Sequence, residues 1–173
     1  MRSKGGTDVR SDMTGKGTHI LRVALQGEPA ILREIEIGSD KRLFDLARTI
    51  VRAFDFDFDH AFGFYSKLTG RDVMHAQPRY ELFVDMGESE DSGSVKRTRV
   101  SEACPVVGHQ MLFLFDYGDD WRFVVTVIRF GKKQPNARYP KVLRKSGPSP
   151  EQYPDWNDDA QEYGDDDEPR RIN

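Results

Sequence analysis

The chain of 173 residues is long enough for one domain with a hydrophobic core, and its single cysteine, Cys104, excludes an intramolecular disulfide and a cysteine-rich zinc site. No apolar run approaches the roughly 20 residues of a membrane-spanning helix, and the first residues lack the apolar core of a signal peptide. We therefore expect a soluble, cytoplasmic protein without a membrane partner.

The formal net charge of −3 is unevenly distributed along the chain. Residues 155–173 contain eight acidic residues against two arginines, whereas residues 1–17 contain four basic residues against two acids. The part between them is nearly neutral. We predict a disordered N-terminal tail over residues 1–17, one domain over 18–154 and an acidic C-terminal tail over 155–173.

The first half of the domain has the pattern of a β-hairpin followed by an amphipathic helix. Apolar residues that include Ile20, Val23 and Leu25 suggest a strand over 19–26, and apolar and polar residues alternate in 30–37, as in paired strands joined by a turn. From Ser39, which we expect to cap the helix, apolar residues recur at helical spacing as far as Phe54. Basic residues occupy the other face. The apolar stripe predicts a helix packed on a sheet.

The patterns between this helix and residue 110 are shorter. Apolar residues predict strands over 60–66 and 80–84, and a Ser-, Gly- and acid-rich stretch predicts a loop over 87–94. One short helix is expected within 99–107, ending before Pro105.

Two apolar segments, 111–115 and 123–128, flank an aspartate-rich turn. Because both faces of each segment are apolar, we predict a hairpin inside the sheet. The turn aspartates fit a loop whose backbone N–H groups are capped by carboxylates. The alternative is an acidic lip for a cation or a basic partner.

Acidic residues and one histidine also offer a candidate metal site. If the turn after residue 115 folds over the start of the 60–66 strand, these groups could converge on a divalent ion for hydrolysis. They are Asp57, Asp59, His60, Asp116, Asp119 and Asp120. The chain has no phosphate-binding loop, dinucleotide-binding or serine-hydrolase motif. We therefore predict no cofactor, and we favour a protein that is not an enzyme.

A basic segment, residues 129–145, offers a second kind of site. It contains no acid and seven basic residues: Arg129, Lys132, Lys133, Arg138, Lys141, Arg144 and Lys145. Such residues bind phosphates electrostatically, and Tyr139 could stack on a base, so nucleic acid is a candidate partner. The acidic tail is joined to this segment by a short connection and could instead shield it.

Four blocks resemble, in order along the chain, the plasmid pRiA4b ORF-3-like family. They are residues 31–35, 53–54, 57–62 and 113–121, and the segment from Tyr139 to Pro154 is similar to the closing part of the family. The chain departs at Leu32, where the family usually has tryptophan, and at Phe123, where histidine is common. The resemblance implies an α+β fold with a curved sheet and a link to mobile elements. It implies no established reaction.

These observations predict an α+β single domain, in which a mostly antiparallel curved sheet carries one main amphipathic helix. The favoured function is a non-catalytic interaction or adaptor module with an unidentified protein partner, for which Tyr117, Trp121 and Trp156 are candidate anchors. The alternatives are a nucleic-acid or phosphate-binding module that uses the basic segment, and a metal-dependent hydrolase that uses the Asp and His residues.

Overall fold

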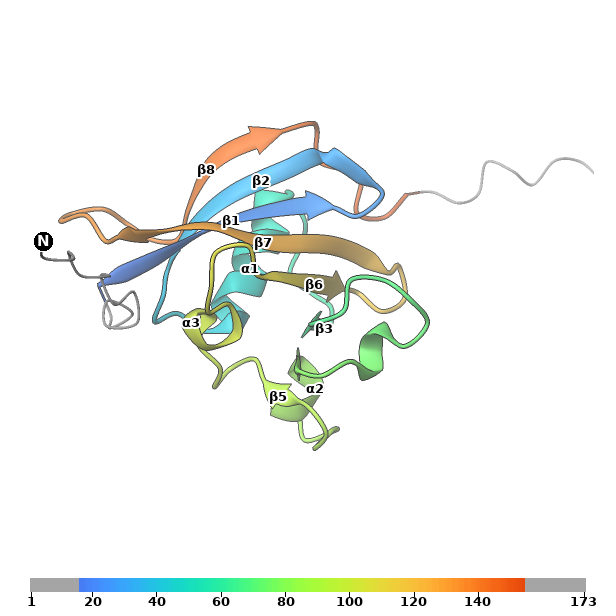
Figure 1. The fold of residues 1–173 in the computed structure, drawn as a ribbon. Helices are drawn as coiled ribbons and strands as arrows, with labels where there is room; N and C mark the ends of the chain where they lie inside the picture. Colours follow the sequence, from blue (N-terminus) through green and yellow to red (C-terminus); the bar gives the residue numbers. More distant parts are fainter. Residues whose placement is uncertain (1–15, 155–173) are drawn as a thin grey trace, which may run out of the picture.

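One large, strongly twisted sheet forms most of the protein in the computed structural model, which describes residues 16–154 (Figure 1). Its eight strands lie in the order β5-β4-β3-β6-β7-β1-β2-β8. The strands are β1 Gly17–Leu25, β2 Glu28–Gly38, β3 Phe62–Tyr65, β4 Arg79–Glu81, β5 Gly93–Ser94, β6 Gln110–Phe115, β7 Trp121–Lys132 and β8 Lys141–Ser146. The helices are α1 Leu43–Ala53, α2 Leu82–Asp85 and α3 Val100–Ala103, with a 3-10 turn, η1, at Val73–His75.

The predicted fold class is wrong. Strands make up 40% and helices 16% of residues 16–154, the three α-helices are short, and the sheet is mixed because β5 runs parallel to β4. The prediction failed mainly for the elements at the two edges of the sheet. Residues 82–84, expected in a strand, form α2, and the two residues of β5 are too few for any period to appear. β8 lies in a polar stretch where we expected no strand.

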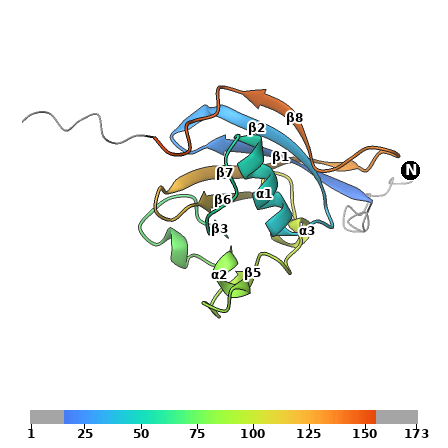
Figure 2. The ribbon, with the colours of Figure 1, turned by 180° about the vertical axis from the view of Figure 1, so that it is seen from behind.

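Helix α1 covers one face of the sheet (Figure 2). Its buried residues, which include Leu46 and Ile50, share a continuous core with Val23 of β1, Ile35 of β2 and Phe113 of β6. This arrangement follows from the period of each element, since apolar residues fall on one side of the helix and alternate along the strands. The helix begins after Arg42, and Ser39 is not its cap.

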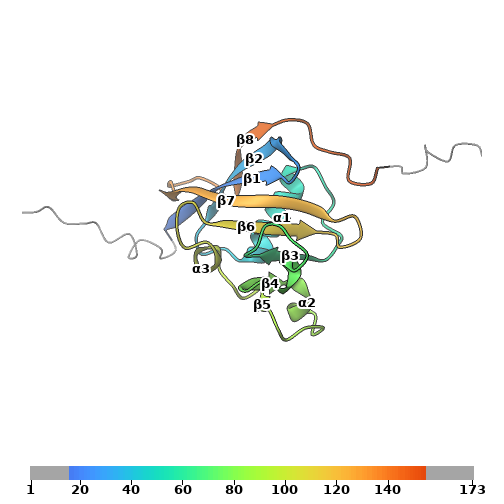
Figure 3. The same ribbon diagram turned by 45° about the vertical axis from the view of Figure 1, so that its right-hand side comes forward.

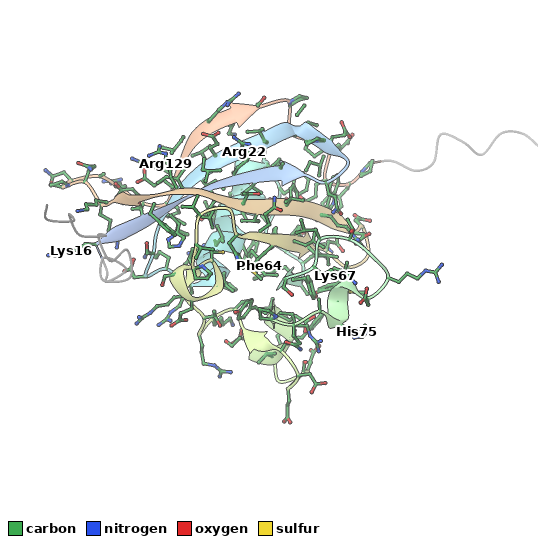
Figure 4. All side chains as sticks on the ribbon, viewed as in Figure 1. Lys16, Arg22, Phe64, Lys67, His75 and Arg129 are labelled. Atoms are coloured by element: carbon green, nitrogen blue, oxygen red, sulfur yellow. The ribbon has the colours of Figure 1, made fainter. Side chains whose placement is uncertain are left out.

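The opposite face of the sheet is covered only in part. A smaller cluster over β3 and β6 contains Tyr65, Val73, Leu112 and Leu114. The segment from β3 to β5, with α2, lies at the lower end of the molecule in Figure 3. Over β7, β1 and β2 this face is open, and we call it the open face; Figure 4 labels Arg22 and Arg129 over this part of the sheet.

His19 binds Ser39 in the turn between β2 and α1. The imidazole is fully buried, its Nδ1 lies 2.9 Å from Ser39 Oγ, and its Nε2 lies 3.0 Å from the Cys104 carbonyl oxygen. The carbonyl can only accept, so Nε2 carries the proton and Nδ1 accepts from the serine hydroxyl. Desolvation lowers the pKa of His19 below 6.5, and the ring is therefore neutral in the folded protein.

Arg33 is the largest buried polar side chain, with 1% of its surface exposed. Its Nε donates to the carbonyl of Ala53 at the end of α1 (2.8 Å), and its Nη1 donates to the carbonyls of Leu32 (2.8 Å) and Ser146 (2.9 Å). Its Nη2 donates to Ser149 Oγ at 2.9 Å. The guanidinium also lies over the ring of Phe54, 4.6 Å from the centroid. One cation thus joins β2, α1, β8 and the segment after β8.

Replacing Arg33 with methionine keeps much of the side-chain volume but leaves these buried carbonyls without a donor. We expect the Arg33→Met variant to lose about 3 kcal/mol of unfolding free energy in urea titrations. The matched control is Arg22→Met in the adjacent strand. Arg22 is half exposed and has one ion pair, 3.9 Å from Glu34, so its loss should change stability by less than about 0.5 kcal/mol. Equal losses in the two variants would contradict the assigned role of Arg33.

Candidate functional site

The basic segment predicted to bind phosphate lies on the end of β7, on the connection to β8 and on β8 itself. Four of its cations form ion pairs with acids: Lys133 with Asp40, Lys141 with Glu36, Arg144 with Glu34, and Lys145 with Asp55. Lys132 also has an interaction partner. By contrast, neither Arg129 nor Arg138 forms a side-chain hydrogen bond or ion pair with another residue of 16–154. The segment is therefore not a uniform basic surface.

Strand β8 divides its basic side chains between the two faces of the sheet. In the pairing with β2, Lys145 lies opposite Arg33 and Arg144 lies opposite Glu34. Neighbouring residues of a strand point to opposite faces, and Arg33 points to the α1 side. Lys145 therefore faces α1, whereas Arg144 lies on the open face with its partner Glu34.

A groove of about 490 Å³ lies between α1 and β8. In Figure 2 the two elements are seen side by side, with α1 in front of the sheet and β8 at its upper edge. The lining residues are Lys41, Asp45, Arg48, Thr49, Arg52, Ala53, Tyr139, Pro140, Val142 and Lys145. We call this feature the cationic groove, because four of these residues are basic and only one is acidic.

The helical wall of the cationic groove follows from the spacing of its charged residues. Lys41, Asp45, Arg48 and Arg52 recur every three or four positions, which places them on one side of α1 and of the turn before it. The opposite side of the helix carries the apolar residues of the core. The same amphipathic pattern that fixes α1 on the sheet thus turns a basic stripe toward β8.

The one acid of the groove is already engaged. The Asp45 carboxylate accepts a hydrogen bond from Arg48 Nη2 at 2.9 Å and from the backbone N–H of Arg42 at 3.3 Å, as expected of an acid in the first turn of a helix. The side chain of Arg52, in contrast, forms no hydrogen bond or ion pair with the rest of residues 16–154. The groove therefore keeps a net positive charge.

The far wall adds one cation and an aromatic ring. Lys145 Nζ lies 3.3 Å from Asp55, in a pair whose side chains are both at least half exposed. Exposed pairs of this kind contribute little free energy, so Lys145 can exchange Asp55 for another anion at small cost. The ring of Tyr139 lines the groove, with Lys141 Nζ 5.0 Å from its centroid. This combination of cations and a ring suits a phosphate-bearing ligand.

The acidic residues 55–60 contact a different part of the chain. The segment after β8, residues 147–154, which we call the closing segment, lies along them: Ser149 Oγ donates to Asp55, the Gln152 side chain accepts from the backbone N–H of Asp57, and the Tyr153 hydroxyl donates to Asp59. The predicted candidate residues Asp57 and Asp59 thus hold the closing segment in place.

His60 links this segment to the turn between β6 and β7. Its Nδ1 lies 2.8 Å from Asp59 and its Nε2 lies 3.5 Å from Asp116. The hydrogen bond to Asp59, together with the charge of Asp116, raises the pKa of His60 above 6.5. The Tyr153 hydrogen bond lowers the pKa of Asp59, and the same contact raises the pKa of Tyr153 to about 12.

The remaining aspartates shape the turn itself. Asp116 has a positive φ of 57°, and its carboxylate accepts from the backbone N–H groups of Gly118 (2.9 Å) and Asp119 (3.3 Å). Asp120 pairs with Arg122 Nε at 2.9 Å. Between residues 16 and 154, no group of three or more His, Cys, Asp or Glu side chains is placed to hold a metal ion. The hydrolase alternative therefore gains no support from this cluster.

The two described aromatic residues expected to anchor a partner have intramolecular contacts. Trp121 packs on Phe56, with ring centroids 4.8 Å apart, and donates its indole N–H to the carbonyl of Gln152 at 3.2 Å. Tyr117 packs on Phe83, and its hydroxyl lies 2.8 Å from the hydroxyl of Tyr65. Trp156, the predicted N-terminal tail up to residue 15 and the acidic tail lie outside the described residues.

Lys41, Arg48 and Arg52 were not among the predicted site residues. The signal was present, since basic residues were expected on the outer face of the helix. What was lacking was the position of β8, because only the pairing of β8 with β2 brings Lys145 and Tyr139 opposite that face.

The two histidines with shifted pKa values provide a direct test of this geometry. In an NMR titration, His60 should titrate above 6.5 and His19 below it. Protonated His60 stabilises the fold below pH 6.5, and this contribution is lost as the pH rises through its folded pKa. Neutral His19 has the opposite effect, so stability falls as the pH drops below 6.5. The Asp59→Asn variant should lower the pKa of His60 and leave that of His19 unchanged; a reversed order of the two pKa values would refute the contacts.

Comparison with known proteins gives a family and a fold. The model of the plasmid pRiA4b ORF-3-like protein family matches residues 18–154. No curated protein matches the chain. A crystal structure of a protein of unknown function, MM3350 from Methanosarcina mazei Go1, is similar with a TM-score of 0.62 and 18% sequence identity, over 78% of this chain and 72% of that one. None of the helices within residues 16–154 has the length and apolar character needed to cross a membrane. The chain belongs to the plasmid pRiA4b ORF-3-like family.

Proposed function

We propose that this protein is a non-catalytic module that binds the phosphate backbone of nucleic acid in the cationic groove. The observation that carries the proposal is the meeting of four basic side chains from two distant parts of the chain around a single acid, Asp45, which pairs with one of them, Arg48. Such a site can bind an anionic ligand without any catalytic group.

The electrostatics of the groove favour a chain of phosphates over a single carboxylate. Each nucleotide carries one negative charge, and binding releases the counterions that had neutralised it. Arg48 and Arg52 are one helical turn apart on α1, with Lys145 on the facing strand, so successive phosphates could contact different side chains. Tyr139 adds a ring on which an unpaired base could stack, which favours single strands over duplexes.

The test is fluorescence anisotropy of labelled single-stranded and duplex DNA and RNA, titrated with the full chain in 50 and 200 mM salt. We expect salt-dependent binding, with a log–log slope of about −2 for single strands if three phosphates are neutralised. Each of the variants Arg52→Glu and Lys145→Glu should weaken binding by about tenfold and make this slope shallower by about 0.7, the contribution of one phosphate.

The matched control is Arg22→Glu, which changes the net charge equally but lies on the open face of the sheet (Figure 4). It should alter affinity by less than about twofold. Circular dichroism confirms that each variant folds. If the groove variants and the control weaken binding equally, the groove is not the site; if no nucleic acid binds at 50 mM salt, the proposed function is wrong.

A further inference from the structure

We propose that the acidic segment 155–168 is an intramolecular ligand of the cationic groove and competes with nucleic acid for it. This inference rests on the proposed function, because it describes how the same site would be regulated. Its physical basis is the charge of the groove, the charge of the segment, and the position at which the described chain ends.

The charges of the two parts are complementary. The groove has four basic residues against Asp45, whereas residues 155–168 contain eight acids and no basic residue. Four of these acids are consecutive, at 165–168, and so present a run of negative charges along the backbone as a nucleic-acid strand does. A site that holds successive phosphates can hold successive carboxylates by the same interaction.

The acidic segment starts near enough to reach the groove. Ser149 donates to Asp55, which also pairs with Lys145 in the groove wall. Pro154 is five residues beyond Ser149, a span of at most roughly 18 Å, and Asp165 is eleven residues beyond Pro154, a span of up to roughly 38 Å. The run at 165–168 can therefore return to the groove without displacing the closing segment.

Tethering makes such a weak contact effective. A ligand on the same chain as its site can have an effective concentration in the millimolar range, so a segment that binds the groove with a Kd of a few hundred micromolar would occupy it most of the time. The exposed Lys145–Asp55 pair opposes this contact only weakly. Nucleic acid would then have to displace the segment, and its apparent affinity would fall accordingly.

The first experiment neutralises the segment in the full chain by changing its eight acids to Asn and Gln. We expect this variant to bind single-stranded DNA about fivefold more tightly than the unmodified chain at 50 mM salt. Neutralising the acids could also strengthen binding simply by removing their general repulsion of DNA. To distinguish this effect from competition for the groove, the unmodified and neutralised segments are compared again in chains that both carry Arg52→Glu and Lys145→Glu. In the proposed arrangement the gain then largely disappears. A gain of the same size in that background would overturn the inference.

The second experiment does not use nucleic acid. A zero-length carbodiimide cross-linker joins carboxylates to amines that are in contact, and peptide mapping identifies the pairs. We expect cross-links from residues 155–168 to Lys145 or Lys41, lost in 0.5 M salt, and far fewer to Lys67, an exposed lysine in the segment between β3 and η1 (Figure 4). Equal labelling of Lys67 would overturn the inference.

Failures of the two proposals are distinguishable. If neither the unmodified chain nor the neutralised variant binds nucleic acid, the proposed function fails. If both bind with the same affinity, the groove is a nucleic-acid site and only the competition by residues 155–168 is refuted.

Discussion

The buried guanidinium of Arg33 joins the two walls of the cationic groove. Removing a cation from water costs several kcal/mol unless its donors are satisfied, and here the acceptors are backbone carbonyls and a hydroxyl from separate elements. The carbonyl of Ala53 ends α1, and that of Ser146 ends β8. Since these two elements are the walls of the cationic groove, the same residue that satisfies the core also sets the distance between the walls.

The elements with a strong local pattern were predictable. β2 alternates with a period of two, β6 and β7 are apolar runs on either side of an aspartate-rich turn, and α1 has the period of a helix, so each pattern reports a local conformation. The start of α1 was misplaced because Arg42 has an extended backbone and pairs with Arg99, so the helix begins only at Leu43. That pairing joins two positions far apart in the sequence, and no local pattern contains it.

Strand β8 and the site could not be predicted for a related reason. In β8 the apolar residues Val142 and Leu143 are adjacent, so the strand lacks a clear alternation, and its charges are matched by Glu34 and Glu36 on a strand more than 100 positions earlier. The basic segment was recognised as a phosphate-binding candidate, but its division between two faces depends on that pairing. The acidic residues 55–60 were recognised as a cluster, whereas their contacts with the closing segment depend on the position of β8.

The pairing of β8 with β2 also determines when the groove can exist. During synthesis the helical wall is made early, but the facing wall is among the last parts of the domain to leave the ribosome, and contacts between such distant positions form late because the intervening chain must first be ordered. An unfinished chain therefore exposes the basic stripe of α1 without the opposing strand. Both walls of the groove are present only after β8 has paired with β2, so a ligand that needs both walls can bind only to the fully folded domain.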